Sequence, residues 1–188
     1  MQFDTAPLQV VRSVTQRGLA LYWDRLRKSR PLPVRSEFEP EERTHDRRQL
    51  AFYSVKRADD CHRYEIQHWG SQIAEVYDLG WTGKHLDEIL PATIKGKILA
   101  AFETCVQTRS PVYMTACTED AAGKSVDCER LLLPFGDGTD VTHIVASLQL
   151  ISIEGAFAQQ KILGDLTTPL DYSIAAIIKP GFSSAAAG

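Results

Sequence analysis

The stretch VYMTACTEDAAGKSVDCERLLLPFGDGTDVTHIVASLQLISI covers residues 112–153 and decides the fold class. It holds three apolar-rich runs of strand length, separated by turns rich in Asp, Ala and Gly. Short connections of this kind join strands that lie side by side, so the stretch predicts an antiparallel meander of three strands. The three runs are Val112–Thr118, Val126–Leu133 and Val141–Ile153.

Two further strands are predicted on the N-terminal side of this meander, over Leu50–Lys56 and Arg63–Trp69. The second run alternates between apolar and polar residues, which is typical of a strand with one buried face. This alternation places Tyr64, Ile66 and His68 on one face, where His68 would put a titratable ring among apolar neighbours.

Helices are predicted between the two groups of strands. Ser71–Tyr77 is a short helical stretch, and Pro91–Thr108 is a longer helix with proline in its first turn. Helices gathered at this point of the chain must cover one face of the sheet. The order of elements therefore predicts an α+β fold, with a five-stranded antiparallel sheet and a pocket between the sheet and the helices.

The segments outside residues 49–153 differ in character from this domain. Residues 1–30 contain an amphipathic helix from about Pro7 to Arg27, whose apolar stripe is covered either by the domain or by a second copy of the chain. Residues 31–48 are rich in charge and proline and predict a linker. In the tail, residues 154–188, a helix is predicted over Gly155–Gly164. The apolar segment Ser173–Phe182 is expected to dock on the domain, on a partner or at a membrane edge.

Composition excludes several classes of protein. The net charge of −3 gives no electrostatic reason to expect a nucleic-acid partner. The N-terminus lacks the pattern of a secretory signal, and the apolar runs are too short to span a bilayer, which takes roughly 20 residues. We therefore expect a cytoplasmic protein. Its four cysteines show no CxxC spacing and are expected to be free thiols.

Four segments of the chain resemble PAS domains, and within them a bacterial group of short, often standalone PAS proteins that begin with a Tyr-Trp helix. The resemblance spans about Leu21 to Ile153 and implies a five-stranded antiparallel sheet, a central pocket and a sensory or interaction role rather than catalysis. Two departures are His68, where the family usually has an apolar residue, and Asp78, where glycine is usual. The matching segments are Leu21–Arg27 with Pro31 and Pro33–Arg35, Tyr64–Ser71, Tyr77–Lys84, and Glu129–Phe135 with Gly138.

The resemblance leaves the cofactor open while arguing against two candidates. Haem-binding PAS domains use a histidine on or near the long helix, and Pro91–Thr108 contains none. Flavin-binding PAS domains hold the ring with asparagines, and this sequence contains no asparagine. The cysteines and histidines could form a zinc site, but their spacing matches no familiar pattern, and we expect no metal.

The sequence therefore predicts a sensory or interaction module, not an enzyme, that binds a small molecule, a signalling protein or both. The predicted homodimer forms through the apolar stripe of residues 8–27. Two alternatives stay open: a small α+β enzyme that uses His68 as general base, and a protein-docking module whose pocket is filled by its own side chains. The residues expected to line the pocket, which would serve equally as plain core, are His68, Tyr64, Ile66, Phe102, Leu132 and Ile144.

Overall fold

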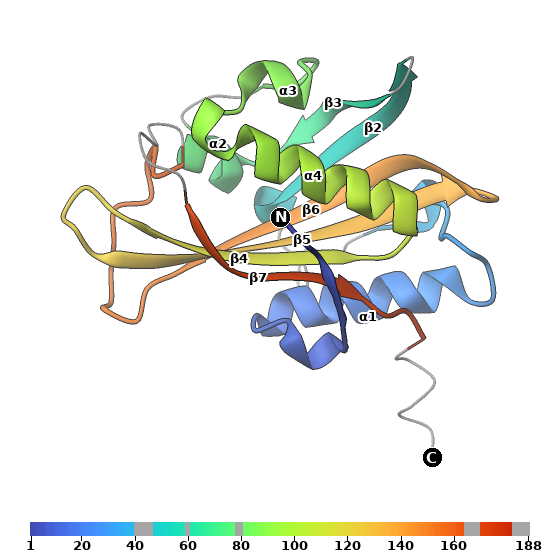
Figure 1. The fold of residues 1–188 in the computed structure, drawn as a ribbon, viewed down its shortest axis with the longest axis horizontal. Helices are drawn as coiled ribbons and strands as arrows, with labels where there is room; N and C mark the ends of the chain where they lie inside the picture. Colours follow the sequence, from blue (N-terminus) through green and yellow to red (C-terminus); the bar gives the residue numbers. More distant parts are fainter. Residues whose placement is uncertain (40–46, 59–60, 78–80, 164–169, 182–188) are drawn as a thin grey trace.

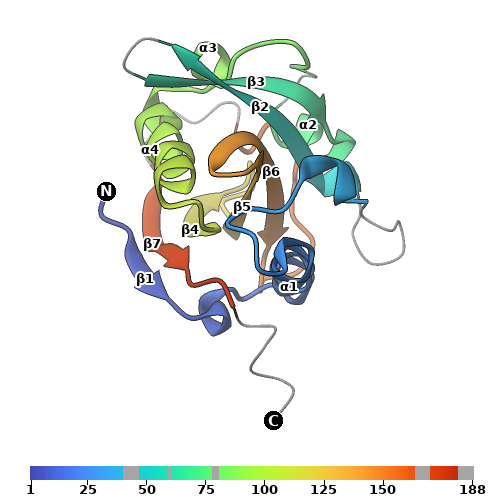
Figure 2. The same ribbon diagram turned by 90° about the vertical axis from the view of Figure 1, so that its right-hand side faces the viewer.

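The computed structural model describes residues 1–39, 47–58, 61–77, 81–163 and 170–181. Its strands form one sheet in the order β1-β7-β4-β5-β6-β2-β3 (Figures 1 and 2). All neighbouring strands are antiparallel except β1 and β7, which are parallel. The strands are β1 (Asp4–Ala6), β2 (Leu50–Ala58), β3 (Cys61–Trp69), β4 (Val112–Glu119), β5 (Ser125–Asp137), β6 (Asp140–Ile151) and β7 (Asp171–Ile178).

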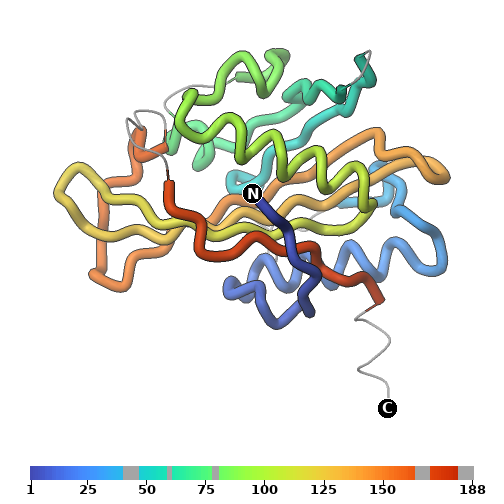
Figure 3. Tube along the Cα trace, viewed as in Figure 1, coloured from blue at the N-terminus to red at the C-terminus, as the bar shows by residue number. Residues whose placement is uncertain are grey.

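The five strands expected from the sequence are all present, but the expected sheet of five strands is too small. Strands β2 to β6 form the predicted antiparallel unit, and β7 extends it beyond β4. Strand β1 then pairs with β7, so that the first and last described strands lie side by side (Figure 3). The segments on either side of residues 49–153 are therefore part of the same sheet.

Helices cover both faces of this sheet. The longest, α4 (Ala92–Thr108), crosses the face that we call inner, together with the short helices α2 (Ser71–Tyr77) and α3 (Leu86–Ile89) (Figure 1). The N-terminal helix α1 (Val14–Arg27) lies on the opposite, outer face. Three short 3-10 turns complete the elements, over Leu8–Val10, Arg35–Glu37 and Arg47–Gln49.

Helix α1 packs against its own sheet. It begins at Ser13, whose hydroxyl accepts a hydrogen bond from the N–H of Gln16 at 3.3 Å, a typical N-cap. The Gln16 side chain is fully buried and donates to the backbone carbonyls of Glu129 and Ser147. The Trp23 indole N–H donates to the carbonyl of Pro134 at 2.6 Å. The apolar stripe expected to form a dimer is therefore largely covered within one chain.

The predicted linker, residues 31–48, is partly built into the core where the structure describes it. Leu32 and Phe38 are only 1% and 2% exposed. The ring of Phe38 packs edge-on against Phe135 at 5.1 Å between centroids, on the same outer face as α1. Residues 40–46 lie outside the described part.

The C-terminal segment differs from its prediction. The expected helix over Gly155–Gly164 is wrong, because residues 155–163, the described part of it, form turns and extended chain. The apolar residues after Leu170 form β7, where Ile178 is fully buried and its N–H donates to the carbonyl of Pro111 at 2.8 Å. The sequence left open whether this segment docks on the domain, on a partner or at a membrane edge. Its described residues dock on the domain.

Asp120 ties this C-terminal region to the turn between β4 and β5. Its carboxylate accepts hydrogen bonds from the N–H groups of Ala122, Lys124 and Ala158, each at 2.9 Å. The bonds from Ala158 and Lys124 are the main reason that the pKa of Asp120 lies below its usual value. Because the pKa is lowered in the folded state, the ionised carboxylate stabilises the fold above the unfolded pKa, and this contribution is lost as the pH falls through the folded pKa.

We therefore expect Asp120→Asn to be less stable than the wild type at pH 7 and to lose less stability on acidification below about pH 4. Urea unfolding at pH 7 and pH 3 checks this. The exposed Asp137 provides the control, because Asp137→Asn should follow the wild type at both pH values. Equal acid sensitivity of Asp120→Asn and the wild type would contradict the assignment.

No helix in the described ranges is long and apolar enough to cross a membrane. All four cysteines are free, as expected; Cys105 and Cys128 are buried, while Cys61 and Cys117 are exposed.

Candidate functional site: a partly buried arginine between the sheet and the short helices

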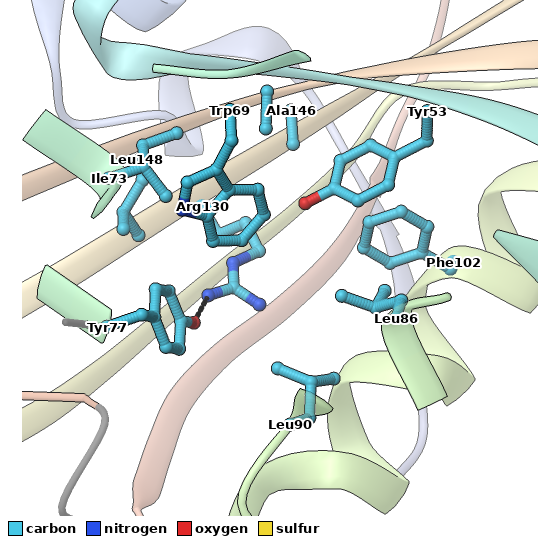
Figure 4. Close-up of a pocket in the computed structure, with 11 residues that line it drawn as sticks. Tyr53, Trp69, Ile73, Tyr77, Leu86, Leu90, Phe102, Arg130, Ala146 and Leu148 are labelled. Atoms are coloured by element: carbon cyan, nitrogen blue, oxygen red, sulfur yellow. Dashed lines mark hydrogen bonds between the residues drawn. The ribbon is translucent and has the colours of Figure 1, made fainter. Parts of the chain in front are cut away.

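Arg130 enters the space between the inner face of the sheet and the helices from the middle of β5. Successive side chains of the strand point to opposite faces, and the preceding residue, Glu129, faces outward to α1. Its carboxylate accepts hydrogen bonds from the hydroxyl of Tyr113 and from the N–H of Ser13. Arg130 therefore points inward, where a strand normally places an apolar side chain. Its guanidinium donates a hydrogen bond to the hydroxyl of Tyr77 at 2.5 Å (Figure 4).

Aromatic rings surround this guanidinium. Trp69 from β3 packs against Tyr77 and Trp81, with ring centroids 5.6 and 5.5 Å apart. Tyr53 from β2 packs edge-on against Phe102 of α4 at 4.9 Å, and Figure 4 shows its hydroxyl pointing toward Trp69. These rings and the aliphatic side chains of α2 and α3 enclose a cavity of about 10 Å³, which is about the room needed by one water molecule. It is lined by Ala51, Tyr53, Trp69, Ile73, Tyr77, Leu86, Leu90, Phe102, Arg130, Ala146 and Leu148.

A second cavity of about 10 Å³ lies on the other side of the same arginine. Its wall includes Tyr172 from β7, so the C-terminal strand contributes directly to the surroundings of Arg130. The Lys97 ammonium sits 4.7 Å from the centre of the Tyr172 ring and donates to the carbonyl of Leu170. This cavity is lined by Ile94, Ile98, Met114, Ala116, Cys128, Arg130, Leu170 and Tyr172.

Two hydrogen-bonding groups around these cavities have no partner among the residues that the structure describes. The indole N–H of Trp69 and the hydroxyl of Tyr172 are both buried without a hydrogen bond. In the described part of the chain, no carboxylate lies within ion-pair distance of Arg130. Buried polar groups are nearly always paired, so the indole N–H of Trp69 at the first cavity and the hydroxyl of Tyr172 at the second are places where a bound molecule could supply a partner.

The tyrosines cannot supply the missing negative charge. Burial raises the pKa of Tyr53 and Tyr77. It also raises the pKa of Tyr172 to about 12. All three hydroxyls are therefore neutral near pH 7, whereas an arginine stays protonated in proteins. The site carries a net positive charge that its own described residues leave uncompensated.

The structure separates His68 from this site. Strand β2 pairs Phe52 with His68 and Tyr53 with Ile66, so Gln67 is an extra residue in β3 and forms a bulge. The bulge reverses the alternation, and it is Trp69, not His68, that shares the inner face with Tyr64 and Ile66. The prediction that Tyr64, Ile66 and His68 share one face is therefore wrong for His68.

On the outer face, His68 packs edge-on against Phe52, with centroids 5.4 Å apart. Burial and the neighbouring charge of Arg47 lower its pKa, and its buried Nε2 atom has no hydrogen-bond partner in the described part of the chain. It does not line either cavity around Arg130.

The other predicted lining residues lie on the inner face. Phe102 lines the first cavity, and Tyr64 packs against it at 4.9 Å while its hydroxyl donates to Glu103. Ile66, Leu132 and Ile144 are fully buried beside the cavities and do not line them. Arg130 was missed, although a charged residue between Cys128 and Leu132 on the inward positions of a strand is a visible signal.

A metal centre finds no support in the geometry. Within the described ranges, no three His, Cys, Asp or Glu side chains come together as ligands. Asp78, the second departure from the family pattern, lies outside those ranges.

Comparison with protein families shows which family the chain belongs to. A sequence profile described as PAS domain matches residues 11–149, which is most of the chain and includes α1. The chain belongs to the PAS domain family. This match confirms the resemblance seen in the sequence, and PAS domains typically act as sensory and interaction modules.

Comparison with individual proteins adds little to this result. Among the solved structures that the PAS chain resembles is the "Structure of an RNA-binding Light-Oxygen-Voltage Receptor". The two are 12% identical, with a TM-score of 0.37; the match covers 58% of this chain and 31% of that one. No curated protein matches the chain.

Proposed function

We propose that this PAS domain is a sensory module that binds a small molecule in the space around Arg130. The observation that carries the proposal is the partly buried guanidinium of Arg130, which has one hydrogen-bond partner among the described residues, near two buried donors that have none there. A positive charge in a largely apolar space is destabilising without a counter-charge, and a bound molecule that accepts hydrogen bonds would offset part of that cost.

The surroundings of Arg130 also suggest how binding would be signalled. Each cavity has room for about one water, so any larger occupant must displace part of its wall. The shortest helices in that wall are α2 and α3, which span only seven and four residues and would be the easiest to shift. Tyr172 connects the site to β7 and hence to the end of the sheet. We propose that occupancy shifts these elements and so changes the surface offered to a signalling partner.

Native mass spectrometry of the purified chain tests the proposal. We expect a species heavier than the bare chain that loses the extra mass on denaturation. The Trp69→Ala variant should lose this species, while the exposed-site control Arg57→Met should keep it. A wild-type protein of bare mass, with an unchanged Trp69 indole signal after incubation with a cell extract, would contradict the sensory role.

The ligand-free docking module remains the second candidate, because the cavities are small enough for the protein's own side chains nearly to fill the space. The alternative enzyme with His68 as general base needs that residue in an open cleft. Since His68 lies on the outer face against Phe52, the geometry gives this alternative no support.

The homodimer through residues 8–27 remains a prediction, as do a bacterial signalling partner and a cytoplasmic location. Few apolar side chains of α1 stay available to a second copy; Val14 is 75% exposed and Leu21 36% exposed. Light scattering of the full chain, compared with Val14→Glu, checks whether this surface joins two copies. A dimer that Val14→Glu dissociates would support the prediction, and a monomeric wild type would contradict it.

A further inference from the structure

The chemical class of the ligand can be inferred from the charges around Arg130. Arg130 is the only charged side chain among the described residues that line either cavity. One guanidinium balances one negative charge, and a dianion such as phosphate would bring a second charge into an apolar space with nothing to offset it. The charge count therefore favours a monoanion.

The hydrogen-bonding geometry favours a carboxylate among the monoanions. A guanidinium presents five N–H donors in a planar fork that matches the two oxygens of a carboxylate. The structure uses this fork for one hydrogen bond, to Tyr77, which leaves N–H groups for a ligand. The unpaired indole N–H of Trp69 and hydroxyl of Tyr172 are further donors in the same region.

The rest of the lining indicates what the carboxylate is attached to. Around the guanidinium stand the aliphatic side chains of Ile73, Leu86 and Leu90 and the ring of Phe102 (Figure 4). These groups offer no hydrogen bonds, so they suit a hydrocarbon or aromatic body rather than a sugar or a second acid group. The small volume of both cavities limits that body to a short one.

Building on the sensory role proposed above, we propose that the ligand is a small monocarboxylic acid whose carboxylate pairs with Arg130. Its short apolar body would lie among the side chains of α2, α3 and α4. In this arrangement the negative charge compensates the partly buried guanidinium, and the body pushes against the short helices. Arg130 thus sets the charge of the ligand, and the helices respond to its size.

Titration of the isotope-labelled protein with matched probes tests the inference. The probes are acetate, butyrate and phenylacetate, the neutral butyramide and phenylacetamide, and inorganic phosphate. The readout is the indole N–H signal of Trp69, identified by its loss in Trp69→Phe among the three tryptophans of the chain. We expect at least one carboxylate to shift this signal and its amide to bind roughly 10- to 100-fold more weakly, because the charge-assisted hydrogen bonds are lost.

Variants of Arg130 test whether this residue is responsible for the preference for carboxylates. Arg130→Met should weaken carboxylate binding by roughly 10- to 100-fold. The affinity of Arg130→Lys should lie between those of the wild type and Arg130→Met, because lysine keeps the charge and loses the planar fork. The control is Arg57→Met, at an exposed position on β2, which should bind as the wild type does. A circular dichroism melt of each variant establishes that it is folded before binding is compared.

Three results would overturn the inference: an amide that binds as tightly as its acid, phosphate that binds more tightly than every carboxylate, or no carboxylate binding at millimolar concentration. In each case the proposed function is judged separately. A neutral or dianionic molecule found on the purified protein by native mass spectrometry would leave the sensory role standing. Only a site that binds nothing would remove both.

Discussion

Trp23→Ala is expected to lower the free energy of unfolding by about 3–5 kcal/mol, the usual cost of removing a large aromatic ring from a packed core. The side chain of Trp23 on α1 is fully buried, and its indole N–H donates a hydrogen bond to the carbonyl of Pro134 in β5 at 2.6 Å. The substitution opens a cavity and also leaves that carbonyl without its partner. Urea unfolding followed by circular dichroism gives the value.

The comparison variants for Trp23 lie on the same helix. Trp23→Phe keeps much of the ring and loses the hydrogen bond, so it should fall between the wild type and Trp23→Ala. Arg25→Ala, at an exposed position, should stay within about 0.5 kcal/mol of the wild type. If α1 served mainly to join two copies, the effect of Trp23→Ala would depend strongly on protein concentration. An effect that does not depend on concentration supports packing within one chain.

Ile178→Ala is expected to cost about 2–5 kcal/mol, because Ile178 is fully buried where β7 meets the rest of the fold. The N–H of Ile178 is bonded to Pro111, just before β4, so the strand is fixed at this end. Asp171→Ala, at the exposed opposite end of β7, is the matched control and should change stability by less than about 0.5 kcal/mol. Equal, small effects of both substitutions would show that β7 adds little to the fold.

The Ile178 variant also bears on the proposed signal. Tyr172 on the same strand lines the second cavity beside Arg130. If ligand binding and β7 docking are coupled, the weakened strand should change carboxylate affinity as well as stability, since coupling between two sites acts in both directions.

The core strands were predictable from the sequence because each is an apolar-rich run of strand length that turn residues separate from the next. Val112–Thr118, Val126–Leu133 and Val141–Ile153 became β4, β5 and β6 with shifts of a few residues. The helix over Pro91–Thr108 became α4, which starts one residue later because Pro91 serves as its N-cap. These elements depend on local patterns, which a sequence carries in full.

The errors arose where distant segments decide the structure. In the sequence, β7 is recognisable only as an apolar run. That it becomes a strand depends on the edge of β4, a distant segment with which it pairs. The bulge at Gln67 follows from the pairing of β3 with β2, and one extra residue moved His68 to the other face. Such pairing depends on residues far apart in the chain, so alternation within β3 alone could not reveal it.

Arg130 was the most informative residue of the site, and its signal was present in the sequence. It stands within the segment Glu129–Phe135 that carries part of the family resemblance, on the same strand face as Leu132. Leu132 was expected to line the pocket, so its face of the strand was already predicted to point inward. What the sequence could not show is whether a carboxylate from another element reaches the guanidinium, and the described structure contains none within ion-pair distance.

The stability of a variant without the guanidinium tests most directly whether Arg130 serves a ligand or the fold. Arg130→Met combined with Tyr77→Phe removes the charge and the hydroxyl that accepts its hydrogen bond, so no new unpaired group remains. Urea unfolding is measured on protein freed of small molecules by refolding from denaturant and dialysis. If the charge serves a ligand, the double variant should be as stable as the wild type or more stable. A loss of more than about 3 kcal/mol, beyond what most substitutions cost, would show that Arg130 serves the fold and would contradict this account.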